Sequence, residues 1–214
     1  MIIEARLPKS WGEVPLRKAM ELESALKSAG ENPYNINAVT ISVLSDIPLS
    51  EVRQWPVSVL NSTDLYEALK FVAKEPEKRM PSERLTLNGK KYDVYLYPQR
   101  WTAGMWMDFT TSAKMENDVK KMARMIACFT VPAGMKYGEG YEFEKVVDEI
   151  NDNMDIETAL GMTSFFQLML ASFVKALLLY SERETKKLKS TRGQASRSSR
   201  RRAGKATPRN GRRS

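Results

Sequence analysis

The chain has 214 residues, with 34 Lys and Arg, 26 Asp and Glu, and a single cysteine, Cys128. It has no histidine, which excludes His-based triads, Cys–His pairs and His-ligated metal sites. A lone thiol cannot form an intramolecular disulfide and is typical of a reducing compartment. We therefore expect Cys128 to be a small buried hydrophobic residue, and we expect a protein that is not an enzyme and holds no cofactor or metal.

The positive charge lies at the C-terminal end. The thirty residues after Glu184 hold twelve Lys or Arg and no acidic residue. The preceding 184 residues therefore carry 22 basic against 26 acidic side chains, a net charge of −4 within an overall charge of +8. This division predicts a globular domain over 1–185 and a disordered, Arg/Lys-rich tail over 186–214.

The sequence of the N-terminal part of the domain predicts short secondary-structure elements. A short strand is expected over 2–7. Pro15 suits the first turn of a helix that runs to Ala29 and stops at Gly30. A second short helix is expected over 36–44, although its β-branched residues leave a strand possible.

Two more short elements follow in the same region. One occupies 48–53 and ends at Trp55-Pro56. The other is a helix over 65–74, for which Thr63 or Asp64 is a suitable N-cap and which Pro76 closes. These elements predict a compact helical front half.

The strongest local pattern predicts a β-hairpin over 84–97. Apolar and polar residues alternate on both sides of Asn88-Gly89, a dipeptide typical of two-residue turns with positive φ. With helices on either side of it in the sequence, the expected fold class is mainly α (α+β), with this hairpin packed against the helices.

Helices are expected again in the second half. Thr102 suits the N-cap of a helix that includes Phe109, and a further helix is expected over 117–129. A loop with three glycines over 132–141 separates it from a helix over 143–150. A short helix over 156–160 precedes Gly161. A long helix over 164–189, with Ser164 as N-cap, completes the domain.

The long helix is apolar over most of its circumference, which indicates burial on several sides, in the domain core or against another protein. The apolar run 165–180 is interrupted by Gln167 and Lys175 and is shorter than the ~20 residues of a spanning helix, so no membrane association is expected. The basic flank would suit a membrane anchor, which is the alternative. Two aromatic and methionine patches are the candidate residues for binding a client, meaning here an apolar helix of another protein. They are Phe165, Phe166, Met169, Phe173, Trp101, Met105 and Trp106.

The basic tail is a candidate polyanion-binding segment, because clustered Lys and Arg bind phosphate backbones without sequence specificity. It contains no aromatic residue, so base stacking is not expected. A solubilising tail, or one that contacts an acidic partner, is the alternative. The candidate residues are Arg192, Arg197, Arg200, Arg201, Arg202, Lys205, Arg209, Arg212 and Arg213.

A series of short motifs runs along 7–180. They are LPKSWGEV (7–14), ISVLSDIPLSEV (41–52), LTLNGKKY (85–92), WTAGMWMDF (101–109) and FFQLML (165–170). In this order they resemble small structural-module proteins of tailed bacteriophages, in particular tail assembly chaperone-like proteins.

The resemblance implies a non-enzymatic phage morphogenesis protein in the cytoplasm of the infected bacterium. Such chaperones coat the apolar helices of a tape-measure protein and help to recruit tail-tube subunits. The implied partners are other phage structural or assembly proteins, within an oligomer or larger assembly. The family often has a longer product made by ribosomal frameshifting, and Lys186-Lys187 lies where the composition changes.

Two other interpretations stay open. One is a virion structural protein, such as a head–tail connector, a tail component or an internal protein, whose basic arm contacts DNA. The other is a regulator associated with host nucleic acid or the ribosome.

Overall fold

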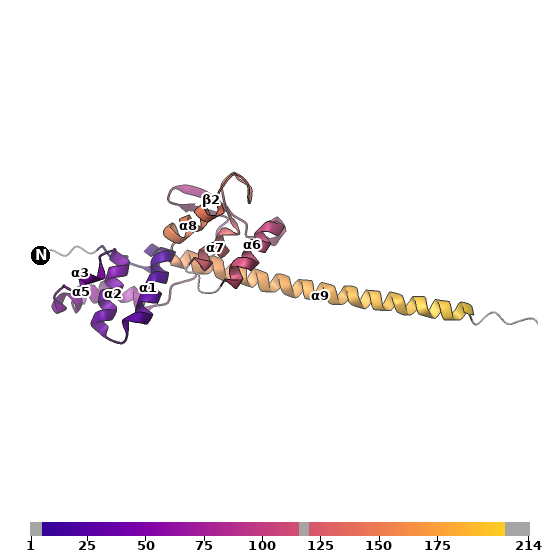
Figure 1. Ribbon diagram of the computed structural model, residues 1–214, viewed down its shortest axis with the longest axis horizontal. Helices are drawn as coiled ribbons and strands as arrows, with labels where there is room; N and C mark the ends of the chain where they lie inside the picture. The colour runs from indigo at the N-terminus through magenta and orange to yellow at the C-terminus, as the bar shows by residue number, and fades with distance from the viewer. Residues whose placement is uncertain (1–5, 116–119, 204–214) are drawn as a thin grey trace, which may run out of the picture. The chain divides into compact units, whose positions relative to one another are not determined.

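The computed structural model describes residues 6–115 and 120–203 (Figure 1). Residues up to Gln167 form one compact unit, and the chain from Leu168 onward forms a second. Helices and one small antiparallel sheet make up the regular structure of the described residues. The mainly α fold with a β-hairpin is thereby confirmed.

The front half is a group of short helices, as the spacing of apolar and breaking residues predicts. They are η1 (Trp11–Glu13), α1 (Leu16–Ala29), α2 (Pro33–Ser45), α3 (Leu49–Val52), α4 (Val57–Leu60), α5 (Thr63–Leu69) and η2 (Lys70–Ala73). Helix α1 ends at Gly30, whose φ of 70° is favourable for glycine. The strand expected over 2–7 is absent at Arg6 and Leu7, and its other residues lie outside the described ones.

Two helix starts in this half are made by side chains that accept a backbone hydrogen bond. The Asn32 side chain accepts from the Tyr34 N–H at 3.0 Å, so residues 36–44 belong to a helix rather than a strand. The Ser62 hydroxyl accepts from the Leu65 N–H at 3.3 Å. Ser62, and not Thr63 or Asp64, is therefore the N-cap of α5.

The expected hairpin is present and gains a third strand. Strands β1 (Arg84–Leu87) and β2 (Lys90–Val94) pair in antiparallel register around Asn88-Gly89, whose φ angles are 47° and 76°. Strand β3 (Thr130–Pro132) pairs with the other edge of β2. Nothing in the short segment around β3 predicts this pairing, because it joins residues nearly forty positions apart.

Two helices lie between β2 and β3 in the sequence, and a third follows β3. They are α6 (Ala103–Lys114), α7 (Lys121–Ala127) and α8 (Phe143–Asn153), with the single turn η3 (Pro98–Arg100) before them. The Thr102 hydroxyl accepts from the Met105 N–H at 3.2 Å, as expected for an N-cap. Helix α7 ends earlier than predicted because the chain turns at Cys128-Phe129 into β3.

The core between these elements is built around the Phe129 ring. The centroids of Trp101 and Phe166 both lie 4.4 Å from that of Phe129, and the centroid of Phe109 lies 5.0 Å away. Phe109, Phe129 and Phe166 are almost completely buried. A second cluster, around Trp55 and Ile41, holds the front helices together.

Helix α9 (Ile156–Ala203) begins beside the start of α1. The Leu16 N–H donates to the Met154 carbonyl at 2.8 Å, and the Ile156 N–H donates to the Val14 carbonyl at 3.0 Å. The Asp155 carboxylate accepts from the Thr158 N–H at 3.0 Å and satisfies the first turn. The helices expected over 156–160 and 164–189 are thus one helix that passes through Gly161, and Ser164 lies inside it.

The backbone of α9 remains helical to Ala203, past the boundary at which the disordered tail was expected. Arg, Lys, Ala and Gln are good helix formers, and no proline precedes Pro208 in this segment. Residues 204–214 lie outside the described residues.

Candidate protein-binding site

The structure places two of the seven predicted client-binding residues in the core and three more half-buried at its edge. Phe166 and Met105 are 0% and 1% exposed. Their predicted surface position is therefore wrong, because residues at helical spacing look alike whether they face the core or the solvent. Trp101, Trp106 and Phe165 are half-buried around the same rings, with Phe165 and Phe166 centroids 5.5 Å apart.

Trp101 is further fixed by a hydrogen bond. Its indole N–H donates to the Tyr95 carbonyl at 2.6 Å, and its ring is stacked near that of Trp106, with centroids 6.1 Å apart. A side chain that is held in this way supports the fold, so this predicted patch mainly serves the core.

A group of exposed large apolar side chains lies further along α9. We name residues 168–180 the apolar segment; Met169 is half-buried and Phe173 is 38% exposed. Five further residues in it are exposed, and none of them was among the predicted site residues. They are Leu168 (69%), Val174 (42%), Leu178 (61%), Leu179 (50%) and Tyr180 (65%).

The exposed residues surround the helix. At ~100° per residue, Leu168 and Leu179 project to one side, while Phe173 and Val174 project to the other. A helix that packs on a single surface needs only one apolar stripe. The apolar segment therefore suits a partner that covers it on several sides. The sequence predicts an apolar helix here, but the predicted patches consist of aromatic and methionine residues and therefore omit the exposed aliphatic ones.

One described helix stretch, Ile156–Ser181, is long and apolar enough to cross a membrane. Its first part, however, includes Ile156, Met162 and Phe166, which are buried in the core. The thirteen residues of the apolar segment that remain span only ~20 Å, against ~30 Å for a bilayer core. The apolar segment by itself is too short to span a membrane.

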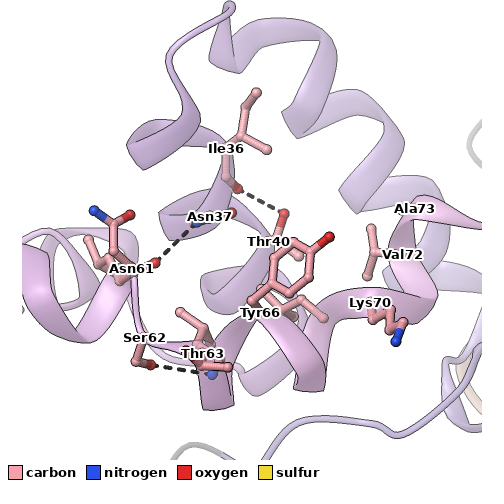
Figure 2. A pocket seen from close by; sticks show the side chains of 13 residues that line it. Ile36, Asn37, Thr40, Asn61, Ser62, Thr63, Tyr66, Lys70, Val72 and Ala73 are labelled. Atoms are coloured by element: carbon pink, nitrogen blue, oxygen red, sulfur yellow. Dashed lines mark hydrogen bonds between the residues drawn. The ribbon is translucent and has the colours of Figure 1, made fainter.

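A separate hollow of about 600 Å³ lies between α2, α5 and η2 (Figure 2). Two of the polar side chains that line it have partners within the protein: the Asn37 amide donates to the Leu60 carbonyl at 3.1 Å, and the Thr40 hydroxyl donates to the Ile36 carbonyl at 2.8 Å. Much of the remaining lining is apolar, and Tyr66 also contributes to it. This hollow offers apolar surface and no converging set of reactive groups.

Two titratable side chains, the buried Cys128 and the half-buried Tyr137, have raised pKa values that favour their neutral forms. Burial raises the pKa of the Cys128 thiol to about 12, and its Sγ donates to the Arg124 carbonyl at 3.1 Å. Burial, followed by a 2.5 Å hydrogen bond to Asp108, raises the pKa of Tyr137. Among the described residues, no group of three His, Cys, Asp or Glu side chains lies close enough to hold a metal ion.

The predicted polyanion-binding residues fall in two places. Arg192, Arg197 and 200–202 lie on the helical backbone of α9. Lys205, Arg209, Arg212 and Arg213 lie outside the described residues.

Comparisons with known proteins found no matching family model, no similar curated protein and no similar solved structure.

Proposed function

We propose that this chain is a non-enzymatic assembly protein of a tailed bacteriophage that binds apolar helices of another protein. In the form that the motif resemblance suggests, it is a tail assembly chaperone, and its clients are a tape-measure protein and tail-tube subunits. The observation that carries the proposal is the apolar segment of α9, in which six large apolar side chains are exposed within thirteen residues.

The physical argument concerns what such a surface does in water. Fully burying a Leu or Phe side chain contributes about 1.5–3 kcal/mol, so the exposure of six large apolar side chains of this kind strongly favours association. Contiguous exposed apolar surface on a soluble protein typically marks an interaction site. An apolar client helix supplies side chains that pack against the apolar segment without any chemical reaction.

The test is co-expression with a tape-measure protein from the same genome, measuring how much client stays soluble and co-purifies. The triple variant L168S/L178S/Y180S should weaken client binding by at least ~100-fold, since each truncation removes about 1 kcal/mol of apolar burial. A matched control, V57S/M80S/M107S, removes equally exposed side chains elsewhere in the described chain (58%, 84% and 64%) and should bind normally. Equal loss of binding in both variants would contradict the proposal.

A second candidate function is a virion structural protein whose basic segment contacts DNA. It is favoured by the twelve Lys and Arg after Glu184. Mass spectrometry of purified virions separates the two candidates, because a chaperone is absent from mature particles and a structural protein is present. Deleting residues 190–214 should abolish DNA binding in either case, so that deletion serves only to locate the charge.

A further inference from the structure

Helix α9 changes its character along its own length. The apolar segment ends at Tyr180, and from Thr185 onward every charged residue is basic. The helical backbone continues without a break from one part into the other, as far as Ala203. A partner helix lying along α9 therefore meets apolar side chains first and, after the mixed-charge turn 181–184, a run in which every charge is positive.

This order of residues disfavours a second copy as the occupant. Two parallel copies would place the eight basic residues of 185–203 beside eight more, with no acidic residue after Glu184 to compensate. Two antiparallel copies that overlap only through the apolar segment share about 20 Å of helix, which is less than two heptads and too little for a stable coiled coil.

From this juxtaposition we infer that the partner of α9 is a helical protein segment in which an apolar stretch is followed or preceded by an acidic stretch. This inference rests on the proposed function and narrows the partner class. The apolar stretch packs on residues 168–180, and the acidic stretch lies along the basic part of the same helix. Charge complementarity of this kind mainly selects the partner and fixes its position, while the apolar contact provides most of the affinity.

A membrane and a nucleic acid fit the same surface less well. The apolar segment is too short to span a bilayer, and the exposed Lys175 lies near its middle. Nucleic acid would neutralise the basic residues and leave the apolar side chains in water. An apolar and acidic protein segment satisfies both parts of the helix together.

The experiment uses the full chain and three synthetic helical peptides. The peptides share one amphipathic Leu/Phe-containing half, and their flanking half carries only Glu, only Gln or only Lys as its polar residues. Binding is measured by fluorescence anisotropy at ~0.05 M and ~0.3 M salt, on either side of strong screening. We expect the Glu peptide to bind about tenfold more tightly than the Gln peptide at low salt, and the Lys peptide to bind most weakly.

Two charge variants of the chain then locate the effect. K186Q/K187Q/K189Q/R192Q removes four positive charges next to the apolar segment, and should weaken Glu-peptide binding by about tenfold. K205Q/R209Q/R212Q/R213Q removes four positive charges beyond Ala203 and is the matched control, with an expected loss of less than about threefold.

Each outcome supports or overturns the inference. Equal affinity for the Glu and Gln peptides overturns the acidic partner while leaving the apolar-helix function in place. Binding of no peptide overturns both. Binding of phosphatidylcholine–phosphatidylserine vesicles or duplex DNA in place of the peptides also overturns it. Equal losses in the two charge variants would show a net-charge effect and would likewise reject the assigned position.

Discussion

Gly161 is where the fold tolerates a side chain least, and replacing it by alanine gives a sharp prediction. A segment without regular secondary structure, residues 74–83, passes close to the first turns of α9 at this position. A Cβ added to Gly161 would lie 1.7 Å from the Arg79 carbonyl oxygen and 2.7 Å from its carbonyl carbon. Both neighbours are backbone atoms, so the crossing segment has to move as a whole.

The crossing segment is held on α9 by several contacts of one residue. The Arg79 N–H donates to the Glu157 carbonyl at 3.2 Å, and its guanidinium lies 2.7 Å from the Glu157 carboxylate. Restoring an ordinary contact of ~3.4 Å to the new methyl group requires a shift of nearly 2 Å, which breaks the backbone hydrogen bond.

The magnitude follows from three opposing effects. Overpacking costs about 1–3 kcal/mol or more, and the lost hydrogen bond costs about 1 kcal/mol. Alanine in place of glycine within a helix returns about 1 kcal/mol. We therefore expect Gly161→Ala to lower the free energy of unfolding by about 1–3 kcal/mol, which for a chain of this size lowers the Tm by roughly 2–12 °C.

The assay is urea unfolding followed by circular dichroism, together with limited trypsin digestion at Lys78 and Arg79, where cleavage should accelerate. The matched control is Gly104→Ala in α6, whose Cβ would lie 3.4 Å from the nearest atom, on the Tyr137 ring. It should leave stability unchanged or raise it by up to about 1 kcal/mol. A Gly161→Ala protein as stable as the Gly104→Ala protein would refute the close approach.

Three further predictions test the core, the hairpin and the buried thiol. Phe166→Ala should lower the free energy of unfolding in urea by about 3–5 kcal/mol, whereas Leu178→Ala should lower it by less than about 0.5 kcal/mol. Similar losses in the two variants would contradict the difference in burial. Gly89→Ala should cost about 1–2 kcal/mol because φ is 76° there, and a neutral effect would show that the turn relaxes. The pKa of Cys128 is raised to about 12 in the folded chain, against an ordinary value of about 8.5. The protonated thiol therefore stabilises the fold fully below pH about 8.5, and this stabilisation is lost as the pH rises toward about 12. Urea midpoints measured across that range should fall accordingly. The pH dependence of the midpoint should be smaller in Cys128→Ala, and an unchanged pH dependence would contradict the assignment.

Much of the local structure could be predicted from the sequence because its causes are local. Asn88-Gly89 specifies a turn through its own backbone preferences, and the Thr102 hydroxyl caps α6 by accepting from a backbone N–H only three residues further along the chain. Gly30 ends α1 for the same kind of reason. The charge division after Glu184 is a property of composition and needs no fold at all.

The tertiary structure alone decided which apolar residues are hidden. Phe166 and Leu178 are both apolar residues of one helix, yet the first is buried against Phe129 and the second is 61% exposed. The pairing of β3 with β2 and the crossing at Gly161 join segments far apart in the chain. Hydrophobic periodicity reports only how a helix is patterned, whereas burial depends on which distant segments reach it, and that information is spread over the whole chain.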